Sequence, residues 1–169
     1  HRGMQDKGSS AVLPELGGNI FRFIDKARDH DLLWKSPRVQ PHRADLHANF
    51  DDHWAGGWDE AFPGGAPSPN RYGDQLPYMG ELWTQHARHE IVEAGPAAVE
   101  LALTIETPIT PARWTRRLRI ERGSPALQIS YRLEHTGHQA FDFIWGIHPV
   151  QAITPAHRFD VPAKHGLVD

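Results

Sequence analysis

The sequence predicts an all-β protein, an antiparallel β-sandwich, and three observations support this class. In residues 99–106 apolar and polar side chains alternate with a period of two, which is typical of a half-buried strand. The same alternation returns in residues 113–120, 127–134 and 141–148. Turn-forming residues, such as those at 123–125, separate these segments at short spacing. Strands joined by short turns indicate antiparallel sheets, because parallel strands need long crossover connections.

Two shorter strands are expected nearer the N-terminus. Residues 19–24 and 32–34 are apolar runs joined by a charged turn, which favours a hairpin. Residues 36–78 are rich in Pro, Gly, His and Asp and have no sustained periodicity. Disordered segments are poor in aromatic residues, whereas this stretch contains Phe50, Trp54, Trp58, Phe62 and Tyr72. We therefore predict an ordered, packed loop region with a functional role, within one domain.

Alternation also assigns faces to the two most distinctive strands. In residues 141–148 one face carries Phe141, Phe143, Trp145 and Ile147, which we expect in the core, and His148 lies on the opposite face. The arginine-rich residues 113–122 invite a phosphate-binding interpretation. Their alternation instead favours a solvated face on which arginines pair with Glu100 and Glu106 across the sheet.

The composition limits the classes of partner and compartment. The 169 residues, 39% of them hydrophobic, suffice for one domain, and no boundary divides them. With 23% charged residues and a net charge of -3, we expect neither a nucleic-acid nor a membrane partner. Cysteine is absent, which excludes disulfides and thiolate metal sites. No leader-like segment opens the chain, so we expect a cytoplasmic rather than a secreted protein.

Metal and cofactor sites are not predicted, although the chain has 12 histidines. Residues 86–90, HARHE, resemble an inverted zinc motif with its last two residues exchanged, and no helical pattern surrounds them. An oxygen–nitrogen metal site stays an alternative, without a recognised spacing, for His42, His47, His53, Asp51 and Asp52. No phosphate-binding loop, dinucleotide fingerprint or nucleophile elbow occurs, so we predict no cofactor.

Carboxylates, aromatic rings and a histidine recur in three short motifs. These are GGWDEAFP at residues 56–63, MGELW at residues 79–83 and WGIHP at residues 145–149. An aromatic face can stack on the C–H face of a sugar while polar groups bond to its hydroxyls. The motifs therefore predict a sugar site formed by Trp58, Asp59, Glu60, Glu81, Trp83 and His148. The sequence does not decide which of the adjacent Asp59 and Glu60 faces the sugar.

The three motifs, in this order, resemble the aldose 1-epimerase (galactose mutarotase-like) superfamily, in particular its aldose epimerase-like branches. GGWDEAFP is similar to a Gly-Trp-Asp-Glu-x-Phe-Pro loop of the family, PYMGELW to its His-Gly-Glu-Leu-Trp segment, and IWGIHP to a strand that ends in His-Pro. The opening residues 13–37 also resemble its first hairpin. The resemblance implies that residues 1–169 form a single galactose mutarotase-like β-sandwich domain, incomplete at the C-terminus, which binds carbohydrate in an open cleft.

The resemblance also implies a reaction and a division of roles. Mutarotation needs an acid that protonates the ring oxygen and a base that removes the anomeric hydroxyl proton. The matching position makes His148 the acid. The family's base is a late glutamate, which we expect beyond residue 169. Met79 stands where related proteins carry a sugar-binding histidine, and its side chain cannot donate a hydrogen bond.

Two function classes follow from these residues. The first is an aldose 1-epimerase-like isomerase that interconverts the anomers of a small-molecule sugar. The second is a carbohydrate-binding β-sandwich without turnover, which tolerates the missing base and Met79 better. A metal-dependent sugar isomerase of the cupin kind lacks the expected His-x-His and Glu spacing. The open sheet edge of an incomplete sandwich would favour pairing with another chain, so a homo-oligomer remains open.

Overall fold

The computed structural model describes residues 8–158 and 160, and in this part of the chain all regular structure except one short helix is β-strand. Sheet I contains β1 (Gly8–Leu13), β2 (Asn19–Asp25), β3 (His30–Asp31), β4 (Trp58–Ala61) and β11 (Gly146–Pro149). Sheet II contains β7 (Arg88–Ala94), β8 (Ala98–Glu106), β9 (Ala112–Glu121) and β10 (Leu127–His135). A separate small hairpin joins β5 (Ser68–Pro69) and β6 (Gln75–Leu76), and the helix is α1 (Phe50–His53).

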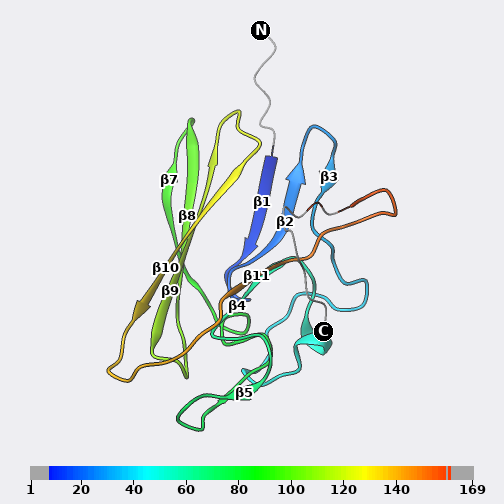
Figure 1. Cartoon of the computed structure of the whole chain (residues 1–169). Coiled ribbons are helices and arrows are strands. Elements are labelled where there is room, and N and C mark those ends of the chain that lie inside the picture. The colour runs from blue at the N-terminus through cyan, green and yellow to red at the C-terminus, as the bar shows by residue number, and fades with distance from the viewer. Residues whose placement is uncertain (1–7, 159, 161–169) are drawn as a thin grey trace.

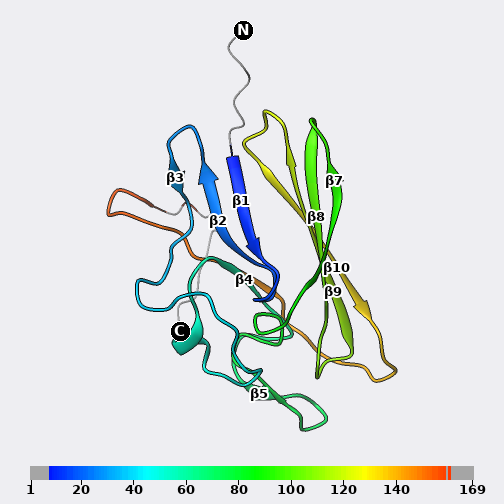
Figure 2. The ribbon, with the colours of Figure 1, turned by 180° about the vertical axis from the view of Figure 1, so that it is seen from behind.

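The two sheets form separate layers. Figures 1 and 2 show sheet I beside sheet II, with α1 and the β5–β6 hairpin gathered near the same end of the molecule. All pairings between the strands of the described residues are antiparallel, which confirms the predicted all-β, antiparallel class. The core between the layers includes Ile20, Phe62, Leu82, Leu103, Ile105, Trp114 and Leu118.

Alternation predicted three of the four strands of sheet II, and it predicted those of sheet I less well. The expected strands at residues 99–106, 113–120 and 127–134 are confirmed. Residues 141–145 are not a strand, and β11 begins only at Gly146. Residues 32–34 also form no named strand, although Leu33 bridges to Gln151. We did not predict β1, which is mostly half-buried and shows no clear alternation, or β7, which is mostly exposed.

The apolar face of residues 141–148 is less buried than predicted. Phe143, Trp145 and Ile147 remain 51%, 39% and 53% exposed. The physical reason is their place: β11 and β10 are outer strands of their sheets, and no other strand of residues 8–158 covers them. Trp145 still contacts sheet II, since its ring centroid lies 4.6 Å from that of Tyr131.

A buried ion pair links the two sheets. Arg116 of β9 is fully buried, and its Nη1 donates to Glu60 Oε1 of β4 at 3.0 Å. The hydroxyl of Tyr131 donates to the same oxygen at 2.6 Å. Burial raises the pKa of Glu60, although the Tyr131 hydroxyl and the Arg116 charge lower it. The alternation of β9 does place Arg116 on the apolar face, so its burial could have been read from the sequence.

The other arginines of β9 lie on the solvated face, as predicted. Arg113 pairs with Glu106 at 2.5 Å and Arg117 with Glu100 at 2.7 Å. Arg119 also reaches Glu100, at 3.3 Å. These pairs lie on the solvated face in high dielectric and contribute little to stability.

The contrast between the two kinds of pair predicts a difference in stability. Arg116→Met leaves the Glu60 carboxylate buried without its cation, which should cost about 3–5 kcal/mol of unfolding free energy. The matched exposed change, Arg117→Met, should cost less than about 1 kcal/mol. Urea denaturation of the two variants measures both values. Equal losses would contradict the structural role assigned to Arg116.

Candidate functional site

The pairing of β4 with β11 organises the site. Asp59 lies opposite His148, and Trp58 lies opposite Pro149. Val150 N donates to Gly57 O at 3.1 Å, and Ile144 N donates to Pro63 O at 2.7 Å. Hydrogen-bonded and non-hydrogen-bonded pairs alternate along an antiparallel ladder, so the pair of His148 with Asp59 is hydrogen-bonded and the pair of Pro149 with Trp58 is not. Pro149 therefore falls in a non-hydrogen-bonded pair, where its missing N–H costs nothing.

The same register separates two adjacent carboxylates. Successive side chains of a strand point to opposite faces. Glu60 points between the sheets toward Arg116, and Asp59 therefore points to the outer face of sheet I. His148 lies on that outer face too, directly across from Asp59, with Cα atoms about 5.5 Å apart in a pair of this kind. The structure thus answers which of the two carboxylates lies beside His148.

Three of the predicted site residues are turned inward. Trp58 packs against the core, and Glu60 lies within the ion pair described above. Glu81 is fully buried and accepts bonds from Ile109 N at 2.6 Å and from the Thr110 hydroxyl at 2.6 Å. In this structure the carboxylates of Glu60 and Glu81 stabilise the packing of neighbouring segments and have almost no exposed surface for a sugar.

An aromatic cluster covers the outer face beside His148. Helix α1 begins after Asn49, whose side chain accepts from Asp51 N at 3.0 Å. The helix stacks the ring of Phe50 on that of Trp54, with centroids 5.2 Å apart. The His148 ring lies 6.0 Å from Phe50 and 5.2 Å from Trp54.

Three further aromatic rings extend this cluster. Trp83 meets Phe50 edge-on at 5.2 Å and donates its Nε1–H to the carbonyl of Tyr78 at 3.1 Å. Trp34 lies 5.6 Å from Trp54, and Tyr78 lies 6.0 Å from Phe50. Trp34 and Tyr78 are each 37% exposed, so they offer accessible aromatic surface.

Asp59 is buried beneath this cluster. Its Oδ2 accepts from Asn19 Nδ2 at 2.8 Å and from Trp54 Nε1 at 2.6 Å. Burial nevertheless raises the pKa of Asp59 to about 6, because the loss of water outweighs these two bonds. The carboxyl therefore orients the Trp54 ring over His148 and titrates close to neutral pH.

His148 is half-buried, and desolvation lowers its pKa below the ordinary value. Its Nδ1 is enclosed and has no hydrogen-bond partner in the described part of the chain. The imidazole is therefore mostly neutral at pH 7. A neutral histidine can donate one hydrogen bond and accept another, depending on its tautomer.

At positions 56 and 57, the glycine pair that begins GGWDEAFP, the backbone conformation and close contacts leave no room for a side chain. Gly56 and Gly57 both have φ of 97°, where other residues are strained. A Cβ on Gly57 would lie 2.6 Å from Asn19 Oδ1, the amide that holds Asp59. The second pair differs, since a Cβ on Gly64 or Gly65 would meet nothing within 4 Å.

The spaces beside the cluster differ in size. A hollow of about 20 Å³ next to Asp59 is lined in part by Asn19, Trp54 and Trp83, and it is large enough for one water molecule. An open depression of about 500 Å³ lies between residues 47–51 and 75–78 and borders Tyr78. A sugar would therefore lie over the outer surface of the cluster, and the small hollow would not admit it.

Two histidines near the small hollow contact each other. His42 Nε2 and His53 Nδ1 are 2.8 Å apart, and His42 Nδ1 lies 2.8 Å from the carbonyl of Gln40. The carbonyl can only accept, so His42 carries a proton on Nδ1. Among the described residues, no group of three or more His, Asp or Glu side chains could hold a metal ion.

Several residues around His148 and Asp59 were not predicted from the sequence as parts of the site. Phe50 and Trp54 are four residues apart, the spacing that brings side chains together on a helix, but a four-residue helix leaves little other signal. Asn19 follows a Gly-Gly pair within an apolar segment, and only the fold reveals that it bonds Asp59.

Comparisons with known proteins add no relative. No protein-family model, curated protein or solved structure matches this chain. Within the described residues, no helix has the length and apolar character needed to cross a membrane.

The glycine contacts predict a sharp difference between two substitutions seven residues apart. Gly57→Ala forces a strained φ and displaces Asn19, which should cost about 1–3 kcal/mol of unfolding free energy. Gly64→Ala meets nothing and should change stability by less than about 0.5 kcal/mol. Thermal and urea unfolding test both variants. A loss at Gly64 as large as that at Gly57 would contradict the contacts described.

The raised pKa of Asp59 predicts how stability depends on pH. A carboxyl whose pKa rises from 3.8 to about 6 on folding stabilises the protein most below pH 3.8, and this contribution is lost as pH rises through 6. The full difference is about 3 kcal/mol. Asp59→Asn can keep both bonds through its amide oxygen, and it should remove this decline between pH 4 and 6. Urea unfolding across this range measures it, and an unchanged profile would contradict the burial of Asp59.

Proposed function

We propose that this chain is an aldose 1-epimerase-like domain that binds a sugar over the outer face of sheet I, with His148 as the group that exchanges a proton with it. The observation that carries the proposal is the position of His148, across from Asp59 and against the aromatic cluster. Aromatic faces beside a hydrogen-bonding imidazole suit a pyranose, which has both C–H faces and hydroxyls.

The proposed reaction opens and closes the sugar ring. The protonated His148 gives its proton to the ring oxygen while the bond from that oxygen to the anomeric carbon breaks. The anomeric hydroxyl loses its proton to a base, and the resulting aldehyde recloses on either face. A lowered pKa makes the imidazolium a stronger acid but leaves less of it at pH 7.

Asp59 has a positioning role in this proposal. Its Oδ2 already accepts two bonds, and it holds the Trp54 ring against His148. Glu60 and Glu81 are engaged by Arg116 and Thr110. We therefore assign no base among the described residues.

A second candidate function, sugar binding without turnover, is favoured by two of these observations. The neutral state of His148 at pH 7 reduces the supply of acid, and the predicted carboxylates other than Asp59 are turned inward. Binding requires only the exposed rings of Trp34 and Tyr78 and one hydrogen-bonding nitrogen of His148.

Anomer exchange tests the first candidate. The protein should accelerate the interconversion of α- and β-glucose or galactose, followed by polarimetry, and His148→Ala should remove a factor of about 10²–10⁴. His157→Ala is the matched control, since this histidine is exposed and lies in a loop. The acceleration should grow as pH falls toward the pKa of His148, because the acid form is then more populated.

The other outcomes separate the candidates. Sugar-dependent stabilisation against heat without any acceleration would support the binding function alone. Equal acceleration by the wild type and His148→Ala would remove His148 from the mechanism. If the protein neither accelerates the exchange nor gains stability from sugars, both candidates fail.

A further inference from the structure

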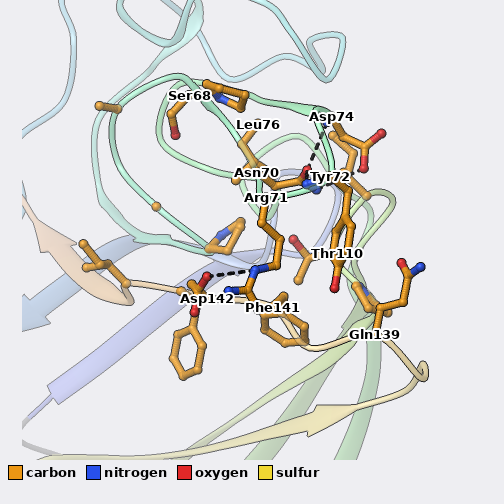
Figure 3. A pocket seen from close by; sticks show the side chains of 18 of the residues that line it. Ser68, Asn70, Arg71, Tyr72, Asp74, Leu76, Thr110, Gln139, Phe141 and Asp142 are labelled. Atoms are coloured by element: carbon orange, nitrogen blue, oxygen red, sulfur yellow. Dashed lines mark hydrogen bonds and ion pairs between the residues drawn. The ribbon is translucent and has the colours of Figure 1, made fainter.

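A second hollow lies at the end of the β4–β11 pair, away from the aromatic cluster. It has a volume of about 390 Å³, within the range of small-molecule sites. Figure 3 shows its lining: residues 68–76 on one side, residues 139–144 on the other, and Thr110 from the turn between β8 and β9. Three segments far apart in sequence thus converge on one space.

The loop on one side of the hollow is fixed by its own hydrogen bonds. Asn70 Oδ1 accepts from Tyr72 N at 2.9 Å and from Asp74 N at 3.0 Å. Its Nδ2 donates to Asp74 Oδ2 at 3.0 Å (Figure 3), and Tyr72 Oη donates to Ala140 O at 2.8 Å. These bonds hold the loop in place before a ligand binds, which lowers the entropic cost of binding.

The charges in the hollow favour a neutral ligand. Arg71 Nε lies 3.5 Å from Asp142 Oδ2, and the two side chains are 50% and 83% exposed. Such an exposed pair contributes little and is easily opened by a ligand. Asp74 adds a second carboxylate, so an anion would meet two negative groups and one positive group. Hydroxyls can donate to the carboxylates and accept from the guanidinium, which suits a polyol.

Aromatic surface accompanies these polar groups. Tyr72 is 51% exposed and Phe143 is also 51% exposed, and both line the hollow with Phe141. Phe143 is supported from behind by Phe62, with ring centroids 5.5 Å apart. Rings next to hydrogen-bonding groups on a fixed loop are the features of a sugar-binding surface.

An open strip joins this hollow to His148. Ile144 N donates to Pro63 O at 2.7 Å, which continues the register of β11 on β4 by one further bonded pair, so residues 144, 146 and 148 share one face, and Ile144 lines the hollow. Ile144 is 77% exposed, and a Cβ added to Gly146 would meet nothing within 4 Å. Along the strand, His148 and Ile144 are separated by about 13 Å.

We propose that this hollow is a second sugar subsite, and that the carbohydrate recognised by the chain is a neutral oligosaccharide extending from His148 over Gly146 to Arg71 and Tyr72. The inference rests on the proposed function, since it takes one sugar unit to lie at His148. In this arrangement Arg71, Tyr72 and Gly146 select for the length of the oligosaccharide.

Affinity as a function of sugar length tests this subsite. The dissociation constants of glucose, maltotriose, cellotriose and galactotriose are measured by calorimetry or by amide shifts in NMR spectra. At least one trisaccharide should bind about tenfold more tightly than glucose, equivalent to 1.4 kcal/mol. Arg71→Ala should abolish this gain and leave glucose binding unchanged. Gly146→Val, which fills the strip, should do the same.

The controls keep the two proposals separable. Asp142→Asn removes the charge of an exposed side chain and keeps its shape. It therefore tests the contact of this carboxylate with the sugar even if Arg71→Ala disturbs the loop. A gain that persists in all three variants, or no gain for any trisaccharide while glucose still binds, would overturn the subsite alone. If neither glucose nor any trisaccharide binds, the proposed function falls with it.

Discussion

The antiparallel pairing of β4 with β11 is the constraint on which the rest of the site depends. Its register sends Glu60 inward to Arg116 and places Asp59 beside His148 on the outer face. A shift of one residue would exchange these faces, burying His148 and exposing the partner of a buried arginine. The Glu60–Arg116 pair therefore fixes the register from inside, while the Asp59–Trp54 bond holds the outer face.

Burial also sets the chemistry of the outer face. Asp59 and His148 are adjacent, and burial disfavours the charged form of each side chain. It therefore raises the pKa of Asp59 and lowers the pKa of His148. At pH 7 Asp59 is therefore mostly ionised and His148 mostly neutral, so the pair carries about one negative charge. Such a pair disfavours an anionic ligand, as does the hollow around Arg71, where two carboxylates accompany one guanidinium.

The sequence predicted β8, β9 and β10 because their apolar and polar side chains alternate, as Leu101, Leu103 and Ile105 show. It failed for β1, which is half-buried without a clear alternation, and for β7, which is exposed along most of its length. The motifs named both Asp59 and His148, which the structure places side by side. The motifs could not distinguish a residue that faces a ligand from one that stabilises the fold. Glu81 has a structural role because it accepts a bond from Thr110, which is 29 residues away in the sequence.

The titration of the His148 imidazole, followed by its ¹⁵N and ¹H signals with and without glucose, tests the central claim most directly. We expect a pKa of His148 below 6.5 in the free protein and a change in its signals on adding sugar, whereas the signals of the exposed His157 should not respond to sugar. A His148 signal that titrates like free histidine and does not respond to glucose, maltotriose, cellotriose or galactotriose would contradict a sugar site on the outer face of sheet I.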